Sequence, residues 1–174
     1  WWRGGDVMTA IDLSHDTALV TGSGRNLGLA IATRLAEAGA RVIVHARSDA
    51  EAAEAMRSIA ALVPDARLSS VVFDLGVPQQ VETAVASLMA QGLTPSVLVH
   101  NAAHLDAQSP GFLDQSRDEF REVFEVNLLG VHHLSQLAAA AMVDAGGGAI
   151  IMISSLAGER AIHGRPAYDA SKAA

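Results

Sequence analysis

The 174-residue sequence predicts an α/β fold in which a doubly wound parallel sheet is covered by helices on both faces. Three observations carry this prediction. Short apolar and β-branched runs alternate with segments whose apolar residues recur at helical spacing. A glycine-rich turn joins the first such run to the first helical segment. The intervening segments are long enough for the right-handed crossovers that parallel strands require.

The first half of the chain contains two strand–helix cycles. A strand is expected at 17–21, and apolar residues at helical spacing follow it. The second strand, 41–46, is apolar almost throughout, which is typical of a strand buried on both faces. Ser48 and Glu51 have the spacing of a capping box, so they should open an alanine-rich helix that extends to about Val63.

Three further strands follow in the same pattern. They are expected at 68–74, 96–100 and 149–154, where apolar runs lie between turn residues. Pro78 suits the first turn of the helix that follows the third strand, because a first-turn residue needs no N–H group for the helix.

Two helices complete the expected order. Ser116 and Glu119 form a second capping-box pattern, which should open one long helix that ends at Gly146. The last helix should begin near Ala167. The sequence stops within it at Ala174 without a capping or turn signal, so we expect an amino-terminal fragment of a longer protein.

Residues 8–174 are expected to form one domain, since no repeat or low-complexity linker divides them. Residues 1–7 precede Met8 and lack the basic start and apolar stretch of a signal peptide. We therefore interpret 1–7 as an upstream extension outside the fold.

Composition excludes several classes of function. The net charge of −7 and the absence of a Lys- or Arg-rich tract argue against a nucleic-acid partner. No apolar run approaches the ~18–20 residues of a membrane span. The sequence has no cysteine, which rules out disulfides and thiolate metal sites and suits a cytoplasmic location. The adjacent His132 and His133 point in different directions on a helix, so no metal site is expected.

The turn after the first strand has the features of a phosphate-binding site. Residues 21–28 read TGSGRNLG. Glycines allow a sharp turn and a close approach of a pyrophosphate, and the amino end of the next helix offers free N–H groups. A tight turn without a ligand is the alternative. The expected contacts to the cofactor are Gly22, Ser23, Gly24, Arg25, Asn26, Leu27 and Gly28.

The residues after the second strand favour NADP over NAD. An acidic residue that would bind the ribose of NAD is absent from the strand end. Arg47 stands there instead and, with Arg25, offers two cations to a 2′-phosphate. The alternatives are that both arginines are solvated surface charges, or that Asp49 reaches the ribose.

A pair of side chains at the start of the last helix suggests acid–base chemistry. Tyr168 and Lys172 are four residues apart and therefore share one helix face. A neighbouring ammonium favours the phenolate form of a tyrosine, which makes it a usable proton donor and acceptor. Ser154 and Ser155 end the fifth strand, and open α/β sheets place their sites at strand carboxyl ends. An amphipathic surface pair is the alternative.

Taken together, these motifs resemble the short-chain dehydrogenase/reductase family, which has an extended Rossmann fold, over residues 17–174. The turn resembles the cofactor turn of the family, with Asn26 in place of a glycine. Residues 100–103, HNAA, resemble its Asn-Asn-Ala-Gly segment, with His100 and Ala103 as departures. The resemblance extends to a member similar to the 3-oxoacyl-ACP reductases.

The resemblance implies roles for individual residues. Tyr168 would pass the proton, Ser155 would hydrogen-bond the substrate oxygen, and Lys172 would bind the nicotinamide ribose. Asn127 would hold a water in the proton relay. Further cofactor contacts are implied for Asp74, Leu75, Asn101, Ala102, Tyr168 and Lys172.

The predicted function is that of an NADP(H)-dependent oxidoreductase that transfers hydride between the nicotinamide and a ketone or secondary alcohol. Two alternatives remain: a non-catalytic nucleotide-binding module, and an inactive fragment with an exposed apolar fifth strand. The resemblance also implies a homo-oligomer for the full-length form. The sequence leaves the substrate open among 3-oxoacyl thioesters, steroids, sugars and small ketones.

Overall fold

The computed structural model describes residues 11–105, 112–160 and 164–174. The predicted extension 1–7 lies outside these residues. Five parallel strands form one sheet in the order β3-β2-β1-β4-β5. They are β1 (Thr17–Val20), β2 (Arg41–Ala46), β3 (Leu68–Val72), β4 (Val97–His100) and β5 (Ala149–Met152). The chain runs outward from β1 to β3 and then returns to the other side of β1, which confirms the predicted doubly wound sheet.

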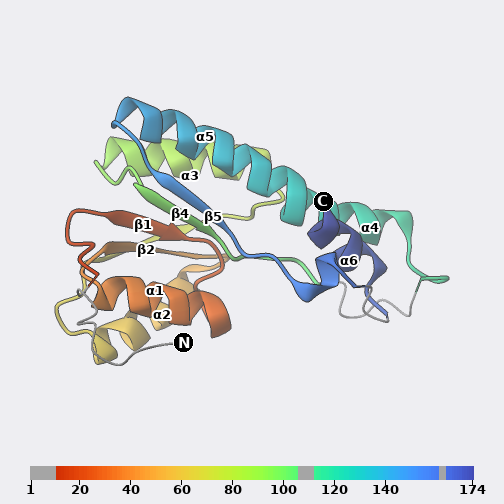
Figure 1. The fold of residues 1–174 in the computed structure, drawn as a ribbon, viewed down its shortest axis with the longest axis horizontal. Helices are drawn as coiled ribbons and strands as arrows, with labels where there is room; N and C mark the ends of the chain where they lie inside the picture. Colours follow the sequence, from red (N-terminus) through yellow and green to blue (C-terminus); the bar gives the residue numbers. More distant parts are fainter. Residues whose placement is uncertain (1–10, 106–111, 161–163) are drawn as a thin grey trace, which may run out of the picture.

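Helices cover both faces of the sheet. On one face lie α1 (Asn26–Glu37) and α2 (Asp49–Leu62), and on the other lie α3 (Pro78–Ala90) and α5 (Val131–Asp144) (Figure 1). Ser48 caps α2, with its hydroxyl accepting the Glu51 N–H, and Pro78 stands in the first turn of α3, as the sequence predicts.

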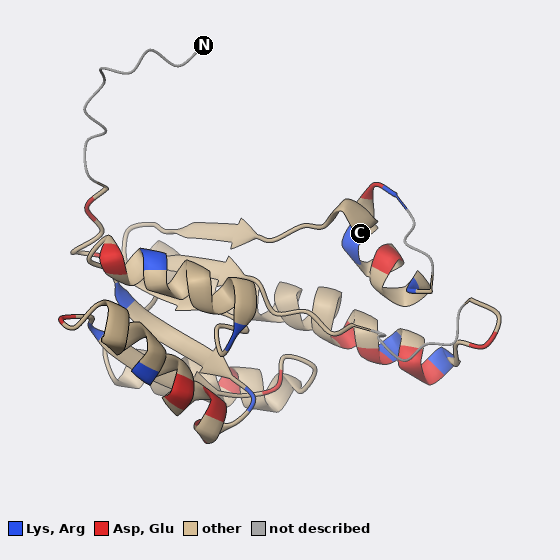
Figure 2. Ribbon diagram, turned by 90° about the horizontal axis from the view of Figure 1, so that it is seen from below, with Lys and Arg blue, Asp and Glu red and all other residues tan. Residues whose placement is uncertain are grey.

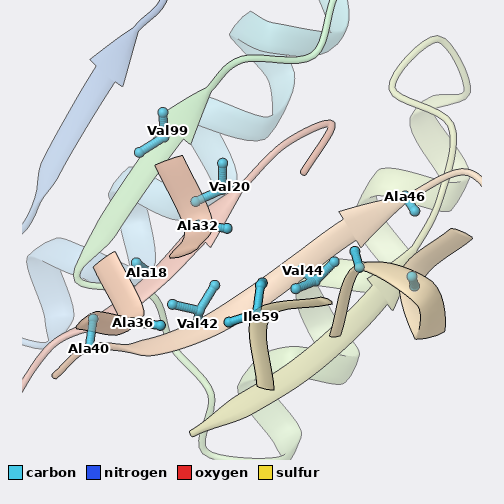
Figure 3. Packing of buried hydrophobic residues seen from close by; sticks show 12 residues of the cluster. Ala18, Val20, Ala32, Ala36, Ala40, Val42, Val44, Ala46, Ile59 and Val99 are labelled. Atoms are coloured by element: carbon cyan, nitrogen blue, oxygen red, sulfur yellow. The ribbon is translucent and has the colours of Figure 1, made fainter. Parts of the chain in front are cut away.

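The core consists of two apolar layers, one on each face of the sheet. Val42 and Val44 pack toward α1 and α2 beside Ile59 (Figure 3). Ile43 lies between them in sequence but belongs to the opposite layer, together with Leu134 of α5. Successive side chains of a strand point to opposite faces, so the nearly unbroken apolar run of β2 serves both layers.

The long helix predicted after Ser116 has three parts. Its beginning is α4 (Arg117–Phe124), where the Ser116 hydroxyl and the Glu119 carboxylate form the predicted capping box. A π-helical segment, η1 (Glu125–Gly130), follows, and α5 then continues the helix to Asp144. The prediction of one regular helix was therefore wrong at η1. Charged residues gather on α4, whereas α5 is almost free of them (Figure 2).

By length and composition, Arg117–Asp144 is the one helix among the described residues that could cross a membrane. Its most apolar window has a mean hydropathy of 1.2 and is 28% buried. The buried residues Leu134 and Ala138 belong to the core layer that α5 shares with α3 and the sheet. A helix that covers a sheet meets the same criteria, and Arg117–Asp144 has that position.

The end of the chain lies beside α4. After β5, which is exposed along its whole length, come a short 3₁₀ turn, η2 (Leu156–Gly158), and α6 (Pro166–Ala173). The structure confirms β5 as an exposed edge strand. Helix α6 packs against η2 and α4, next to the carboxyl ends of the central strands (Figure 1).

Candidate active site

A cleft of about 560 Å³ opens at the carboxyl ends of the strands. It is lined by the turn after β1, by the residues that follow β2, β3 and β4, and by Tyr168 of α6. The predicted site residues that line it are Gly22, Arg25, Asn26, Leu27, Gly28, Arg47, Asp74, Leu75, Asn101, Ala102 and Tyr168. Thus one cleft contains most of the predicted cofactor residues and the predicted proton donor.

The turn between β1 and α1 has the close approaches that glycines permit. A Cβ atom on Gly28 would lie 2.2 Å from the Gly22 carbonyl oxygen and 2.4 Å from the Asn101 amide nitrogen. Asn26 has φ of +50°, the left-handed conformation that asparagine tolerates better than most residues. The expectation that Asn26 can replace a glycine here is therefore confirmed.

The amino end of α1 faces this cleft without a protein cap. Arg25 is the N-cap residue, and its side chain makes no capping hydrogen bond. The first turn of α1 also contains no acidic residue. Unpaired N–H groups and the positive end of the helix dipole make such a helix end suitable for an anion.

Two predicted cofactor residues, Ser23 and Gly24, do not line the cleft. The Ser23 side chain is fully buried, and its hydroxyl accepts the backbone N–H of His45 at 3.0 Å. A Cβ atom on Gly24 would lie 2.5 Å from the Glu51 side chain. Ser23 and Gly24 therefore support the turn without lining the cleft. Glu51, which the sequence analysis did not predict as a site residue, is part of the cleft wall.

His45 at the end of β2 is a further residue that the sequence analysis missed. Its Nδ1 accepts the Gly22 backbone N–H at 2.8 Å, and its Nε2 donates to the Phe73 carbonyl at 3.0 Å. The ring is almost fully buried, and burial lowers its pKa from 6.5 to about 4. The only sequence signal is a polar residue inside an otherwise apolar strand.

The segment after β4 ties the two central strands together. The Asn101 amide donates to the carbonyls of Thr21 and Gly22 at 3.0 and 3.1 Å. The Thr21 hydroxyl accepts the backbone N–H groups of Asn101 and Ala102. The Asn101 side chain thus supports the turn, and its predicted contact to a cofactor stays a prediction.

Asn127 lies in η1, and its side-chain amide is fully engaged by the protein. Its Oδ1 accepts the His104 N–H at 2.7 Å, and its Nδ2 lies 3.0 Å from the His104 carbonyl and 2.9 Å from the Ser171 hydroxyl. The Ser171 hydroxyl in turn donates to the Tyr168 carbonyl. Asn127 therefore connects the segment after β4 to α6.

Tyr168 and Lys172 share one face of α6, as predicted. The Lys172 ammonium is 5.8 Å from the centre of the Tyr168 ring and donates to the Ile153 carbonyl at 2.9 Å. Burial lowers the pKa of Lys172 below its usual 10.5. The Ser155 hydroxyl accepts the Ala157 N–H at the start of η2. Tyr168 lines the cleft, whereas Lys172, Ser155 and Asn127 are not among its lining residues.

The remaining histidines show no metal site in the described part of the chain, where no three metal-binding side chains gather. His133 has its Nε2 at 3.3 Å from the Glu82 carboxylate. His163, which the sequence places between Ser155 and Tyr168, lies outside the described residues.

Comparisons with known proteins show the family to which the chain is related. The family profile described as short chain dehydrogenase matches residues 16–174. A 3alpha-hydroxysteroid dehydrogenase of Mediterraneibacter gnavus is 31% identical over 163 residues, which are 92% of this chain and 63% of that protein. A 3-oxoacyl-[acyl-carrier-protein] reductase of Chlamydia trachomatis is 30% identical over 161 residues, 92% of this chain and 64% of that protein. The expected likeness to such reductases is thus confirmed.

A solved structure has a similar fold. The gluconate 5-dehydrogenase of Burkholderia cenocepacia, in complex with NADP and tartrate, matches with a TM-score of 0.81 and 31% identity over 94% of this chain and 63% of that one. This chain therefore spans less than two thirds of the length of each of these three proteins.

Proposed function

The chain belongs to the short-chain dehydrogenase/reductase family, and on this premise we propose that the protein is an NADP(H)-dependent oxidoreductase acting on a ketone or secondary alcohol. One observation carries the proposal: a single cleft contains both the uncapped amino end of α1 and Tyr168. The first feature suits a pyrophosphate, and the second supplies a proton-transfer group. Such an arrangement serves a reaction in which hydride and proton move together.

The cleft fits a dinucleotide in chemistry as well as in size. Gly28 leaves no room for a side chain, so the amino end of α1 packs closely against the turn that would receive the pyrophosphate. Arg25 and Arg47 line the cleft near the end of β2 and are placed to bind a 2′-phosphate. Glu51 and Asp74 also line it and oppose an added negative charge. The two arginines, with the NADP complex of the gluconate 5-dehydrogenase, support NADP over NAD.

The cofactor preference has a direct test. Replacement Arg47→Ala removes one cation, and the Kd for NADPH should rise about tenfold, in line with the loss of one charge-assisted contact. The Kd for NADH, which lacks the 2′-phosphate, should change little. Arg57→Ala, on the exposed side of α2, is the control. Equal effects of Arg47→Ala on both Kd values would remove the basis for NADP.

Tyr168 and the residues near it would have different roles in the reaction. The bound dinucleotide supplies or accepts the hydride. Tyr168 would hold the proton at its phenol oxygen, and the Lys172 ammonium lies 5.8 Å from the centre of its ring. Ser155 would donate a hydrogen bond to the substrate oxygen. Asn127 would hold a water in the proton relay, and both atoms of its side-chain amide also have protein partners.

The decisive experiment is Tyr168→Phe, which removes one oxygen atom. NADPH oxidation should fall at least ~100-fold while NADPH affinity stays the same, since the phenol serves proton transfer. The assay uses a steroid ketone, a keto sugar and a 3-oxoacyl thioester. Ser87→Ala, which removes an exposed hydroxyl from α3, is the matched control. Retained turnover in Tyr168→Phe would discard this role.

A nucleotide-binding module without turnover is a second candidate. Lys172, Asn127 and Ser155 all have protein partners and lie off the cleft wall, which favours binding over chemistry. The two candidates differ in one measurement. Both bind NADPH, but only the oxidoreductase consumes it with one of the three carbonyl substrates.

A homo-oligomer and a cytoplasmic location complete the proposal. Leu129 and Val143 on the long helix are 51% and 75% exposed, which supports a contact between two copies along this helix. Sedimentation of the protein over a range of concentrations tests that contact. A small-molecule substrate, with neither nucleic acid nor membrane as partner, is consistent with the net charge of −7.

A further inference from the structure

We propose that His45 is a positioning residue that sets the shape of the phosphate-binding turn by holding the Gly22 amide. The inference deepens the proposed function, because the turn matters only if it binds a dinucleotide. Nothing in the motif itself points to His45, which lies on a different strand from the turn. The contacts around its ring and backbone carry the argument.

His45 directly follows the last residue of β2 that pairs with β1, while it still pairs with Val71 of β3. Strands β1 and β2 pair in register up to Val20 and Val44, and no ladder pair follows. Beyond that point His45 continues the connection between the two strands. Its backbone N–H donates to the Ser23 hydroxyl at 3.0 Å, and its carbonyl accepts the Ser23 N–H at 3.0 Å. The side chain adds the bond from the Gly22 N–H, so one residue contacts two successive residues of the turn.

The peptide groups around Gly22 are held from two sides. The Gly22 N–H donates to His45 Nδ1, and the Gly22 carbonyl accepts from the Asn101 amide at 3.1 Å. Gly22 has φ of +63°, a conformation that glycine adopts without steric strain. Because the Gly22 N–H is held by β2, the N–H groups that remain for a phosphate are those farther along the turn and at the start of α1.

The ring is suited to this task through both nitrogens. Accepting at Nδ1 requires that Nε2 carry the hydrogen, and Nε2 has the Phe73 carbonyl at 3.0 Å as its acceptor. Phe73 also packs against the ring, with the two centres 4.1 Å apart. Burial favours the neutral ring by lowering its pKa, so the acceptor at Nδ1 is maintained at neutral pH.

Two substitutions test the roles of the two ring nitrogens of His45 separately. In His45→Asn the amide oxygen can take the place of Nδ1 and accept the Gly22 N–H. In His45→Gln the longer side chain reaches toward the Phe73 carbonyl and leaves Gly22 without an acceptor. Both variants lose the ring that packs on Phe73, so a merely structural role predicts the same effect from each.

The first readout is NADPH affinity by calorimetry. We expect His45→Asn to bind within about threefold of the native protein and His45→Gln at least about tenfold more weakly, the size of one lost hydrogen bond to a buried donor. Equal affinities of the two variants would overturn the inference. If the native protein binds no NADPH, the proposed function fails instead.

The second readout does not depend on a ligand. Hydrogen exchange at the Gly22 amide, followed by NMR, should stay slow in His45→Asn and become at least about tenfold faster in His45→Gln. Equally slow exchange in His45→Gln would overturn the inference even if the proposed function holds. If either variant fails to fold, the tautomer of His45 in the native protein, observed by NMR, provides the test. A hydrogen on Nδ1 at neutral pH excludes the hydrogen bond from the Gly22 N–H, and a hydrogen on Nε2 supports it.

Discussion

The two buried histidines make the free energy of unfolding depend on pH below about 6.5. His45 and His100 are only 2% and 4% exposed. Burial lowers the pKa of each from 6.5 to about 4. Asp74 and Glu51 favour the His45 cation and Arg47 opposes it, but burial prevails. His100 Nε2 contacts only the neutral Ser135 hydroxyl, at 2.8 Å.

The sign follows from proton binding in the two states. Below pH 6.5 the unfolded chain protonates its histidines, whereas the folded chain leaves these two neutral until about pH 4. The unfolded state therefore binds more protons in this window, and stability falls as the pH falls from about 6.5 to about 4. At pH 5 each histidine should cost about 2 kcal/mol relative to pH 7, or about 4 kcal/mol together.

Urea unfolding at pH 7, 6 and 5 measures this loss. His100→Asn should retain about half of it, because only His45 then titrates in the window. Replacement His132→Gln, at an exposed position of α5, should leave the loss unchanged and is the control. Equal stability at pH 7 and pH 5 in the native protein would refute the reasoning, as would an undiminished loss in His100→Asn.

Two further predictions concern the turn and a helix cap. Gly28→Ala places a Cβ atom 2.2 Å from the Gly22 carbonyl and 2.4 Å from the Asn101 amide, so NADPH affinity by calorimetry should fall at least ~100-fold, with about 2 kcal/mol of stability. Gly92→Ala, with no atom within 4 Å, should lower stability through its positive φ but leave affinity intact. Ser116→Ala removes the capping box of α4 and should cost about 1 kcal/mol in urea unfolding without changing NADPH affinity.

The strands of the sheet could be predicted because the hydrophobic pattern is local. In strand β2, Val42, Ile43 and Val44 alternate between the two core layers. A strand whose side chains serve both layers is apolar at successive positions, and this unbroken apolar run can be recognised in the sequence. The Ser48 cap of α2 and the capping box of Ser116 and Glu119 are equally local, since the residues that form each are three positions apart.

The parts that escaped prediction depend on contacts between distant segments. Segment η1 interrupts a regular helix where Gly130 meets the backbone of Leu75, so close that a Cβ atom on Gly130 would lie 2.2 Å from its carbonyl oxygen. Ser23 turns away from the cleft because His45, 22 residues along, takes its hydroxyl. Neither contact leaves a pattern in the residues next to it.

The segment after β4 joins the two halves of the candidate site. At one end, Asn101 donates to the backbone of the phosphate-binding turn. At the other, the His104 backbone is held by Asn127, whose amide also reaches Ser171, and Ser171 donates to the Tyr168 carbonyl. Two side-chain amides thus fix the position of Tyr168 relative to the turn. Since hydride transfer and proton transfer must meet at one substrate carbonyl, this chain of contacts is what would hold the two reacting groups at a constant separation.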